Sequence, residues 1–365
     1  MPMPAGTDVA HLAALAGLDR EQLIRALRLM YMSRRIDDRE ILLKRQNKIF
    51  FQVSAAGHEA IQIAAGMATR AGYDWFYAYY RDRALALTLG ITAEDMLLQA
   101  VGAAADRASG GRQMPSHWSS PELHIVTGSS PTGTQFLQAA GCAHSSSYVN
   151  PGSDEVTLVC TGEGATSEGE FWECINAACL DRLPLVIVVE DNKFAISVPV
   201  ERQTAGGSIS AILRSMPHLF ITECDGTDFP ASYQAMSEAV AYARSGRGPA
   251  LVHAHCTRPY SHSLSDDERL YKTAAERAEE AARDPLVTFP ALLIREGILD
   301  RQSLQAIIEE VDEHIQEVTD RVLLAEPPAS GSSLLYLYSE KWIPPRTRSR
   351  RSLPSKATPG PWWTR

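Results

Sequence analysis

The sequence of 365 residues lacks several features that would each indicate a class of protein. No apolar run reaches the roughly 18 residues typical of a membrane span, so no association with a membrane is predicted. The N-terminus has no basic flank before its apolar stretch and is a poor signal peptide. None of the six cysteines forms a Cys-x-x-Cys pair. This pattern disfavours a zinc site and predicts buried free thiols in a cytoplasmic protein.

Basic charge is scarce as well. The chain has 35 Lys and Arg against 44 Asp and Glu, a formal net charge of -9, so nucleic acid is not expected as a partner. The exception is segment 344–365, which contains five Arg and one Lys without an acid. Such a composition predicts a disordered tail, with a basic interaction arm or an altered natural C-terminus as the alternatives.

Hydrophobic patterning divides the chain into three predicted parts. Residues 1–48 show the three- and four-residue apolar spacing of helices, with Asp19 as a candidate cap. Residues 49–330 form the predicted α/β domain, ending in charged helices. Residues 331–365 form the predicted basic tail.

The central part predicts a doubly wound, mostly parallel sheet flanked by helices. Two apolar runs at 155–164 and 183–192 enclose a helical stretch, which is typical of a βαβ unit. Two further runs, LFITECDG and PALVHAHCTR, repeat this arrangement. Ligands bind such sheets at the carboxyl ends of the strands. Those ends carry Gly162–Gly164, Asp191–Asn192, Asp225–Gly226 and Arg258–His262.

The segment from Gly162 to Asn192 contains the groups that a Mg²⁺-bound diphosphate needs. Glu163 lies between two glycines, which allow close approach of the backbone to phosphates. A helix opening near Ser167 would direct its N–H groups at the anion. Asn192 and the carbonyl of Phe194 add oxygen donors that suit Mg²⁺. Taken alone, a Gly-Glu-Gly triplet between a strand and a helix is also typical of a simple turn.

The full segment, GEGATSEGEFWECINAACLDRLPLVIVVEDNKFAIS, closely resembles the thiamine diphosphate motif of 2-oxoacid dehydrogenases. It is most similar to the alpha subunit of the branched-chain (2-oxoisovalerate) type. The resemblance implies that thiamine diphosphate and Mg²⁺ are the cofactors. It further implies that the metal is held by Glu163, Asn192 and Phe194, and that the cofactor lies against Gly162, Glu163, Gly164 and Ala165.

Other segments extend the resemblance over roughly residues 20–325. YYRD at 79–82 resembles a Tyr-Arg pair that contacts the diphosphate, here Tyr80 and Arg81, although a surface ion pair is the alternative. GGRQMPSHW at 110–118 resembles a loop leading toward the cofactor, in which Arg112 and His117 are either functional or structural.

GSSPTGTQ at 128–135 resembles a segment that lines the cofactor and substrate region. The resemblance implies that Ser130 and Thr132 face the thiazolium half. Ser129, Thr134 and Gln135 match residues that hold a monovalent cation in some relatives. Capping of the following helix is an alternative role for these residues.

TRPYSHSLSDDERLY at 257–271 resembles a cofactor loop of the same family. Arg258 is expected to reach the diphosphate and His262 to lie over the cofactor. Because histidine titrates near neutral pH, His262 suits proton transfer during acyl transfer and is the predicted catalytic residue. Ser263 and Ser265 match positions phosphorylated in mitochondrial relatives, but nothing in this sequence implies a kinase.

The implied reaction is oxidative decarboxylation of a branched-chain 2-oxo acid with acyl transfer to a lipoyl group. In the family, the Glu that activates the aminopyrimidine lies on a beta subunit. The resemblance therefore implies an α2β2 assembly that serves a lipoyl-bearing acyltransferase core. Similarity to fused forms leaves open whether this is a separate alpha chain or part of a fusion.

Three alternatives remain open at this point. The first is a pyruvate- or acetoin-specific enzyme of the same family. The second is a non-catalytic scaffold, which Asp191 suggests because many relatives have Asn there. The third is a nicotinamide-dependent dehydrogenase, which is disfavoured because GEGATSEG has Ser where the third glycine of that motif belongs.

Overall fold

The computed structural model describes residues 15–336. Contacts divide the chain into two compact units, Met1–Pro328 and Ala329–Arg365. The second unit contains one described short helix, η4 (Ser332–Leu334). The predicted boundaries at residues 48 and 330 stay predictions, and the basic segment 344–365 lies outside the described residues.

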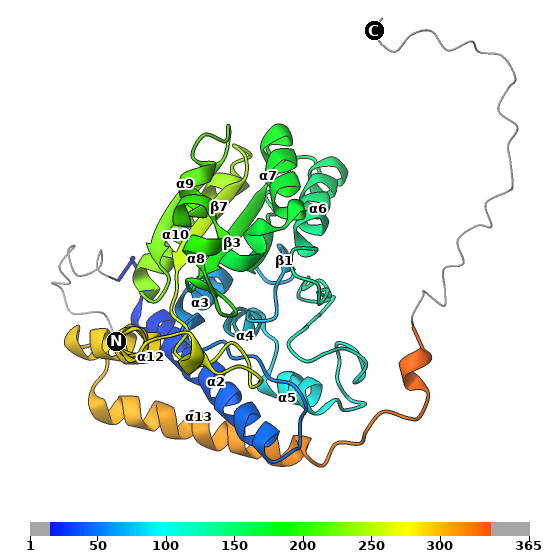
Figure 1. Cartoon of the computed structure of the whole chain (residues 1–365), viewed down its shortest axis with the longest axis vertical. Helices are drawn as coiled ribbons and strands as arrows, with labels where there is room; N and C mark the ends of the chain where they lie inside the picture. The colour runs from blue at the N-terminus through cyan, green and yellow to red at the C-terminus, as the bar shows by residue number, and fades with distance from the viewer. Residues whose placement is uncertain (1–14, 337–365) are drawn as a thin grey trace, which may run out of the picture. The chain divides into compact units, whose positions relative to one another are not determined.

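A five-stranded parallel sheet forms the centre of the first unit, in the order β1-β2-β3-β7-β6 (Figure 1). Every neighbouring pair is parallel, which confirms the doubly wound parallel sheet. A two-stranded antiparallel hairpin follows β3. The strands are β1 (Trp75–Tyr77), β2 (Thr157–Gly162), β3 (Leu185–Asp191), β4 (Phe194–Ala195), β5 (Val198–Pro199), β6 (Phe220–Asp225) and β7 (Ala250–His255).

Helices cover both faces of the sheet. One face packs against α6 (Gln135–Val149), α7 (Gly169–Asp181) and α9 (Ile209–Leu213), and the other against α3 (Glu59–Ala68) and α10 (Phe229–Arg244). The remaining helices are α2 (Arg20–Arg45), α4 (Arg83–Leu89), α5 (Ala93–Val101), α8 (Val200–Gln203), α11 (Ala274–Ala282), α12 (Pro285–Arg295) and α13 (Arg301–Val322), with 3-10 turns η1 (Glu163–Ser167), η2 (Ala205–Gly207) and η3 (Glu268–Leu270).

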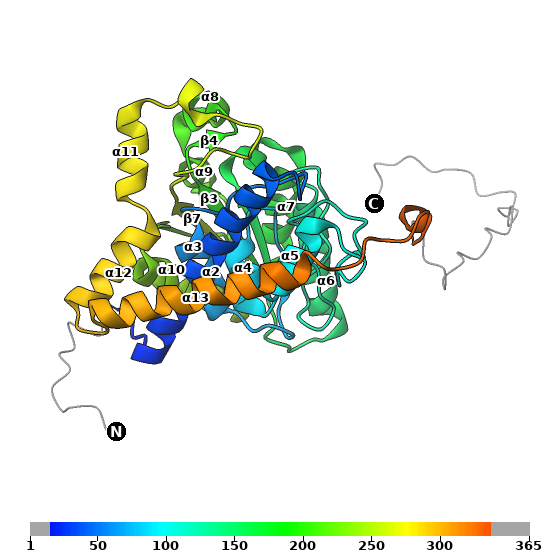
Figure 2. The ribbon, with the colours of Figure 1, turned by 90° about the horizontal axis from the view of Figure 1, so that it is seen from below.

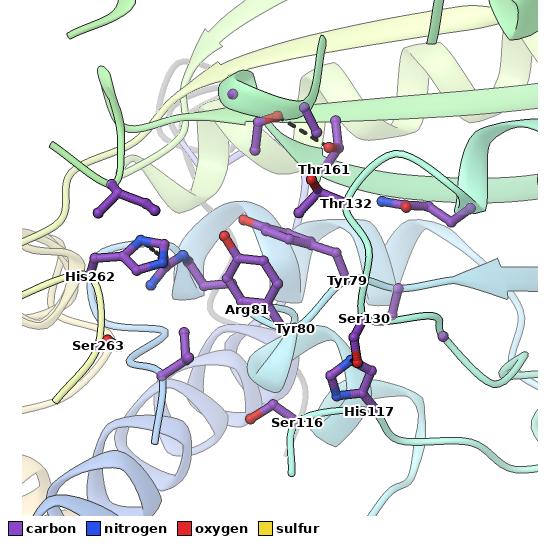
Figure 3. A pocket seen from close by; sticks show the side chains of 18 of the residues that line it. Tyr79, Tyr80, Arg81, Ser116, His117, Ser130, Thr132, Thr161, His262 and Ser263 are labelled. Carbon is purple, nitrogen blue, oxygen red and sulfur yellow. Dashed lines mark hydrogen bonds between the residues drawn. The ribbon is translucent and has the colours of Figure 1, made fainter. Parts of the chain in front are cut away.

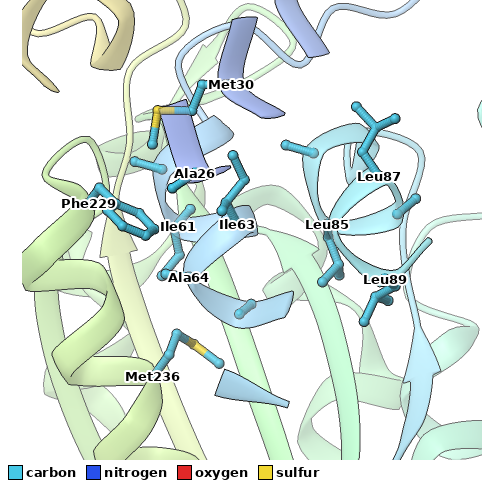
Figure 4. Packing of buried hydrophobic residues seen from close by; sticks show 14 of the residues in the cluster. Ala26, Met30, Ile61, Ile63, Ala64, Leu85, Leu87, Leu89, Phe229 and Met236 are labelled. Atoms are coloured by element: carbon cyan, nitrogen blue, oxygen red, sulfur yellow. The ribbon is translucent and has the colours of Figure 1, made fainter. Parts of the chain in front are cut away.

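Successive side chains of the buried strands point to opposite faces of the sheet and join two hydrophobic layers, one on each face. In β3, Val186 and Val188 join the layer of α3 and α10, whereas Ile187 and Val189 join the layer of α6 and α7. Figure 4 shows the first layer, where small side chains of α3 pack among larger neighbours. Gly66 permits this approach, because a Cβ there would lie 2.6 Å from Cγ2 of Thr88 on α4.

Helix α2 begins where the sequence predicted. The side chain of Asp19 accepts a hydrogen bond from the backbone N–H of Gln22, and Gln22 returns one in a capping box. Helix α2 lies alongside α13 in both views (Figures 1 and 2). The two charged helical segments at the ends of this unit therefore pack on one another.

Three simpler expectations can also be compared with the structure. Residues 103–133 contain no helix or strand, as predicted. The six cysteines, all within the described residues, are free thiols, of which Cys142 and Cys224 are only partly buried. No helix within residues 15–336 is long and apolar enough to cross a membrane.

Candidate functional site

A cavity of about 460 Å³ opens at the carboxyl ends of β2 and β3 (Figure 3). We call its two parts the metal end, formed by Glu163, Asn192 and Phe194, and the loop end, formed by Phe51, Met114, His117, Ser130, Ile196 and His262. The cavity thus brings together most of the residues that the sequence singled out. Its lining includes Tyr80, Arg81, Ser130, Thr132, Gly162, Glu163, Gly164, Ala165, Asn192, Phe194 and His262.

Glu163 carries the main charge of the metal end. Its side chain is 2% exposed, and one oxygen accepts a 3.3 Å hydrogen bond from the backbone N–H of Asn192. The other oxygen, Oε1, is buried without a hydrogen-bond partner among the described residues. Burial, and next the nearby Asp191 carboxylate, raise the pKa of Glu163 to about 7. A buried carboxylate oxygen without a partner is the feature expected of a cation ligand.

Asn192 and Phe194 place two neutral oxygens beside this carboxylate. The side-chain Oδ1 of Asn192 accepts the backbone N–H of Phe194 at 3.3 Å. Its amide Nδ2 donates to Nε2 of His58 at 3.1 Å. The sequence pointed to the two oxygens but missed His58. Carboxylate, amide and carbonyl oxygens are the donors that Mg²⁺ prefers, so the residues present fit this ion.

The two glycines beside Glu163 have different neighbours in the fold. A Cβ on Gly164 would lie 2.9 Å from the Cβ of Ala195, so this glycine permits packing of η1 against β4. A Cβ on Gly162 would meet only Tyr79 and a backbone oxygen, at ordinary contact distance. A helix begins near Ser167 as predicted, since the 3-10 turn η1 ends at Ser167 and α7 begins at Gly169.

Gln203 is a second residue that the sequence analysis missed. Its Nε2 lies 3.1 Å from the carbonyl of Glu163, 2.5 Å from that of Gly164 and 3.0 Å from the hydroxyl of Ser167. The side chain therefore braces the turn that carries Glu163. No motif or spacing indicates this contact, because the residues lie about 40 positions apart in the chain.

Tyr80 and Arg81 meet His262 of the loop end in this cavity (Figure 3). Nη2 of Arg81 lies 3.3 Å from Nδ1 of His262, and the Arg81 guanidinium lies over the ring of Tyr80. Burial first, then the charge of Arg81, lowers the pKa of His262 to about 4. The expectation that this ring titrates near neutral pH is therefore wrong for the ligand-free chain, where the ring is neutral.

Arg258 contacts the hairpin that follows β3, and its predicted contact with the diphosphate stays a prediction. It is buried but is not among the cavity-lining residues of the described chain. Its guanidinium donates to the carbonyl of Phe194 at 3.4 Å, to that of Ile196 at 2.8 Å and to the hydroxyl of Tyr271 at 2.7 Å. In this structure Arg258 holds the hairpin that follows β3.

The loop end contains a Ser–His contact. Nδ1 of His117 donates to the carbonyl of Pro115 at 3.0 Å, which leaves Nε2 to accept the hydroxyl of Ser130 at 3.1 Å. His117 therefore lines the cavity, whereas Arg112 of the same loop does not.

Of the three residues that match a monovalent-cation site in relatives, two line the cavity and one does not. Ser129 and Gln135 line the cavity. Thr134 precedes α6, but its hydroxyl donates to the carbonyl of Pro131 and makes no cap hydrogen bond. The strand end at Asp225, expected at the same edge, lines a separate cavity.

Comparison with known proteins identifies the family of this chain. The sequence model of the dehydrogenase E1 component matches residues 27–329. The chain belongs to the dehydrogenase E1 component family. The resemblance and the α/β fold expected of that family are therefore confirmed.

Individual relatives of this E1-family chain are alpha subunits. It is 37% identical over 326 residues to 2-oxoisovalerate dehydrogenase subunit alpha of Bacillus subtilis, covering 89% of this chain and 97% of the relative. It is 32% identical over 322 residues to 3-methyl-2-oxobutanoate dehydrogenase subunit alpha of Mycobacterium tuberculosis, covering 87% and 83%. It is 31% identical over 335 residues to the pyruvate dehydrogenase E1 component subunit alpha of Mycoplasma pneumoniae, covering 91% and 89%.

Proposed function

We propose that this E1-family chain is the alpha subunit of a 2-oxoacid dehydrogenase that holds thiamine diphosphate through Mg²⁺. The observation that supports this proposal most strongly is the buried Oε1 of Glu163, which has no hydrogen-bond partner among the described residues. Glu163 lines one end of the cavity together with Asn192 and Phe194, and Arg81 lines the same cavity. A scaffold that had lost its cofactor would gain nothing from keeping this carboxylate buried, because burial without a partner is costly.

Each cofactor-facing residue has a separate task in this proposal. Glu163, Asn192 and the carbonyl of Phe194 bind the metal. Arg81 binds the diphosphate, with the backbone of Gly162–Ala165 beside it. Arg258 donates to the Phe194 carbonyl and keeps it in place. When bound, the cofactor supplies the electron sink for loss of CO₂.

The loop end acts on the substrate side. The neutral ring of His262 accepts a proton during transfer of the acyl group, and its position against Arg81 and Tyr80 fixes the ring at the cavity. Ser130 and Thr132 face the same space, with the Ser130 hydroxyl oriented by His117. These assignments keep His262 as the proposed catalytic residue.

A second chain must complete the site. Glu163 is the only carboxylate among the cavity-lining residues of the described chain, and it is committed to the metal. The carboxylate that activates the aminopyrimidine therefore comes from a beta subunit in an α2β2 assembly. A lipoyl-bearing acyltransferase core receives the product. A cytoplasmic location stays a prediction.

The substrate is a branched-chain 2-oxo acid. Phe51, Val53, Met114, Trp118 and Ile196 give the cavity apolar surface for an aliphatic side chain. The likeness to the Bacillus subtilis 2-oxoisovalerate enzyme supports the same choice. Pyruvate is the second candidate, supported by the likeness to the Mycoplasma pneumoniae subunit.

The test is an assay of oxidative decarboxylation with the beta partner, over a panel of 2-oxo acids. We expect activity to require the partner, thiamine diphosphate and Mg²⁺, with higher kcat/KM for 2-oxoisovalerate than for pyruvate. A higher kcat/KM for pyruvate would show that pyruvate is the substrate instead. Calorimetry that detects no binding of thiamine diphosphate with Mg²⁺ would support a scaffold instead.

A further inference from the structure

His58 lies behind the metal end and outside the cavity lining. It directly precedes α3, and its side chain is 0% exposed. Its two ring nitrogens each have one partner, the carbonyl of Ala56 at 3.2 Å from Nδ1 and Nδ2 of Asn192 at 3.1 Å from Nε2. The ring thus connects a backbone carbonyl on one side to a proposed metal ligand on the other.

The Ala56 carbonyl determines the tautomer of this ring. A carbonyl oxygen can only accept, so Nδ1 of His58 must carry the hydrogen. In the neutral ring Nε2 is then an acceptor, and the Asn192 group facing it must be the NH₂. Burial, and next the charge of Arg81, lowers the pKa of His58 well below its ordinary value, in agreement with a neutral ring.

Asn192 is constrained a second time from its other side. The backbone N–H of Phe194 can only donate, so the group 3.3 Å from it must be Oδ1. A flipped amide would set NH₂ against this N–H and an oxygen against the lone pair of His58. Both contacts therefore select the same orientation, with the amide oxygen on the side of the Phe194 N–H.

The turn that carries His58 is itself held firmly. Gly57 has a φ of +87°, and a Cβ there would lie 2.1 Å from the carbonyl oxygen of Thr257. The N–H of Gly57 donates to Glu59 at 2.7 Å, and Glu59 is paired with Arg34. The Ala56 carbonyl consequently has little freedom to turn away from the ring.

We propose that His58 is a positioning residue that fixes the Asn192 amide with its oxygen toward the metal. This inference rests on the proposed function, since it assumes that Asn192 binds Mg²⁺. Without an acceptor at position 58, the amide can rotate and offer NH₂, which repels a cation. The expected consequence is weaker Mg²⁺ binding.

The experiment titrates Mg²⁺ by calorimetry into the full chain, purified with its beta partner and saturated with thiamine diphosphate. His58→Leu should raise the Mg²⁺ Kd by about 10- to 100-fold, the usual cost of losing a group that orients a metal ligand. His58→Gln should recover most of this affinity, because a glutamine can donate to Ala56 and accept from Asn192. Thr319→Val is the control, because Thr319 is also buried and its hydroxyl donates to the Ile315 carbonyl within α13.

A double-mutant cycle separates orientation from general damage. In an Asn192→Asp background both side-chain atoms are oxygens, so rotation is harmless and His58→Leu should no longer affect Mg²⁺ affinity. Wild-type affinity in His58→Leu, or equal losses in Thr319→Val or in the Asn192→Asp background, would overturn the inference. Failure of the wild-type protein to bind Mg²⁺ with thiamine diphosphate is a different result, which overturns the proposed function itself.

Discussion

The metal end and the loop end of the cavity are built in different ways. At the metal end, Glu163 and Asn192 are almost fully buried and come from one βαβ unit, 29 residues apart. At the loop end, Met114 is 46% and Ile196 55% exposed, and the lining comes from segments spread between Phe51 and Ser263.

This difference indicates where each part of the function is fixed. A buried frame of short contacts can hold a metal in one geometry before any ligand arrives. Exposed loop side chains leave room for a partner chain and for different substrates. We therefore expect substitutions at the metal end to abolish cofactor binding, and those at the loop end to alter rate or stability more mildly.

The largest effect is expected from a substitution at the metal end. Glu163→Ala removes the charged ligand and should weaken Mg²⁺ and thiamine diphosphate binding by about 1000-fold, since even losing a supporting group costs roughly 10- to 100-fold. Calorimetry on the chain with its partner measures this. Glu173→Ala, an exposed site on α7, is the control and should bind like wild type. If Glu163→Ala still binds Mg²⁺ and thiamine diphosphate, the metal binds at another site.

The next prediction concerns stability instead of binding. A substitution that removes only the charge of Glu163 should stabilise the metal-free protein. Burial raises the pKa of Glu163 from 4.5 to about 7, so its stabilising contribution is full below pH 4.5 and is lost as the pH rises through 7. Without metal, Glu163→Gln should therefore be more stable than wild type above pH 7, by up to about 3 kcal/mol.

Urea unfolding in EDTA at pH 5 and pH 8 checks this prediction. The advantage of Glu163→Gln should be small at pH 5 and large at pH 8, and Glu173→Gln should show neither. With Mg²⁺ and thiamine diphosphate the wild type should become the more stable protein. A pH-independent difference would mean that the carboxylate is not strained by burial.

Sequence reasoning predicted the fold and the proximity of Glu163 to Asn192 for the same physical reason. Periodicity and glycine positions within 155–192 encode a βαβ unit, and that unit alone brings Glu163 to Asn192. It could not find His58, which contacts Asn192 across 134 residues, because only the folded core makes them neighbours.

The direction of two side chains could not be predicted, for a related reason. Arg258 follows a strand whose end was located correctly, yet its side chain turns to backbone carbonyls that no motif specifies. Asp225 also ends a strand at the expected edge but lines another cavity. Strand ends can be located from sequence, whereas the direction of each side chain depends on its neighbours.

A smaller effect is expected from His262 at the loop end. His262→Ala should lower the rate of acyl transfer to the lipoyl group roughly 100-fold, the usual contribution of a general acid or base. Single-turnover kinetics with a lipoyl domain measure this step apart from cofactor binding. His144→Ala, exposed on α6, should leave the rate unchanged. An unaltered rate in His262→Ala would remove this residue from catalysis.

The smallest expected effect comes from Ile196, where the loop end carries backbone strain. This β-branched residue has a φ of +56°, in the left-handed region that glycine adopts freely. Because its side chain is 55% exposed, little packing is lost on removing it. Ile196→Gly should therefore raise the free energy of unfolding by about 1 kcal/mol. Val198→Gly, in the same hairpin on extended strand β5, should lower it, because that residue has no strain to relieve. Equal losses in both variants would mean that the Ile196 side chain contributes more by packing than its backbone costs.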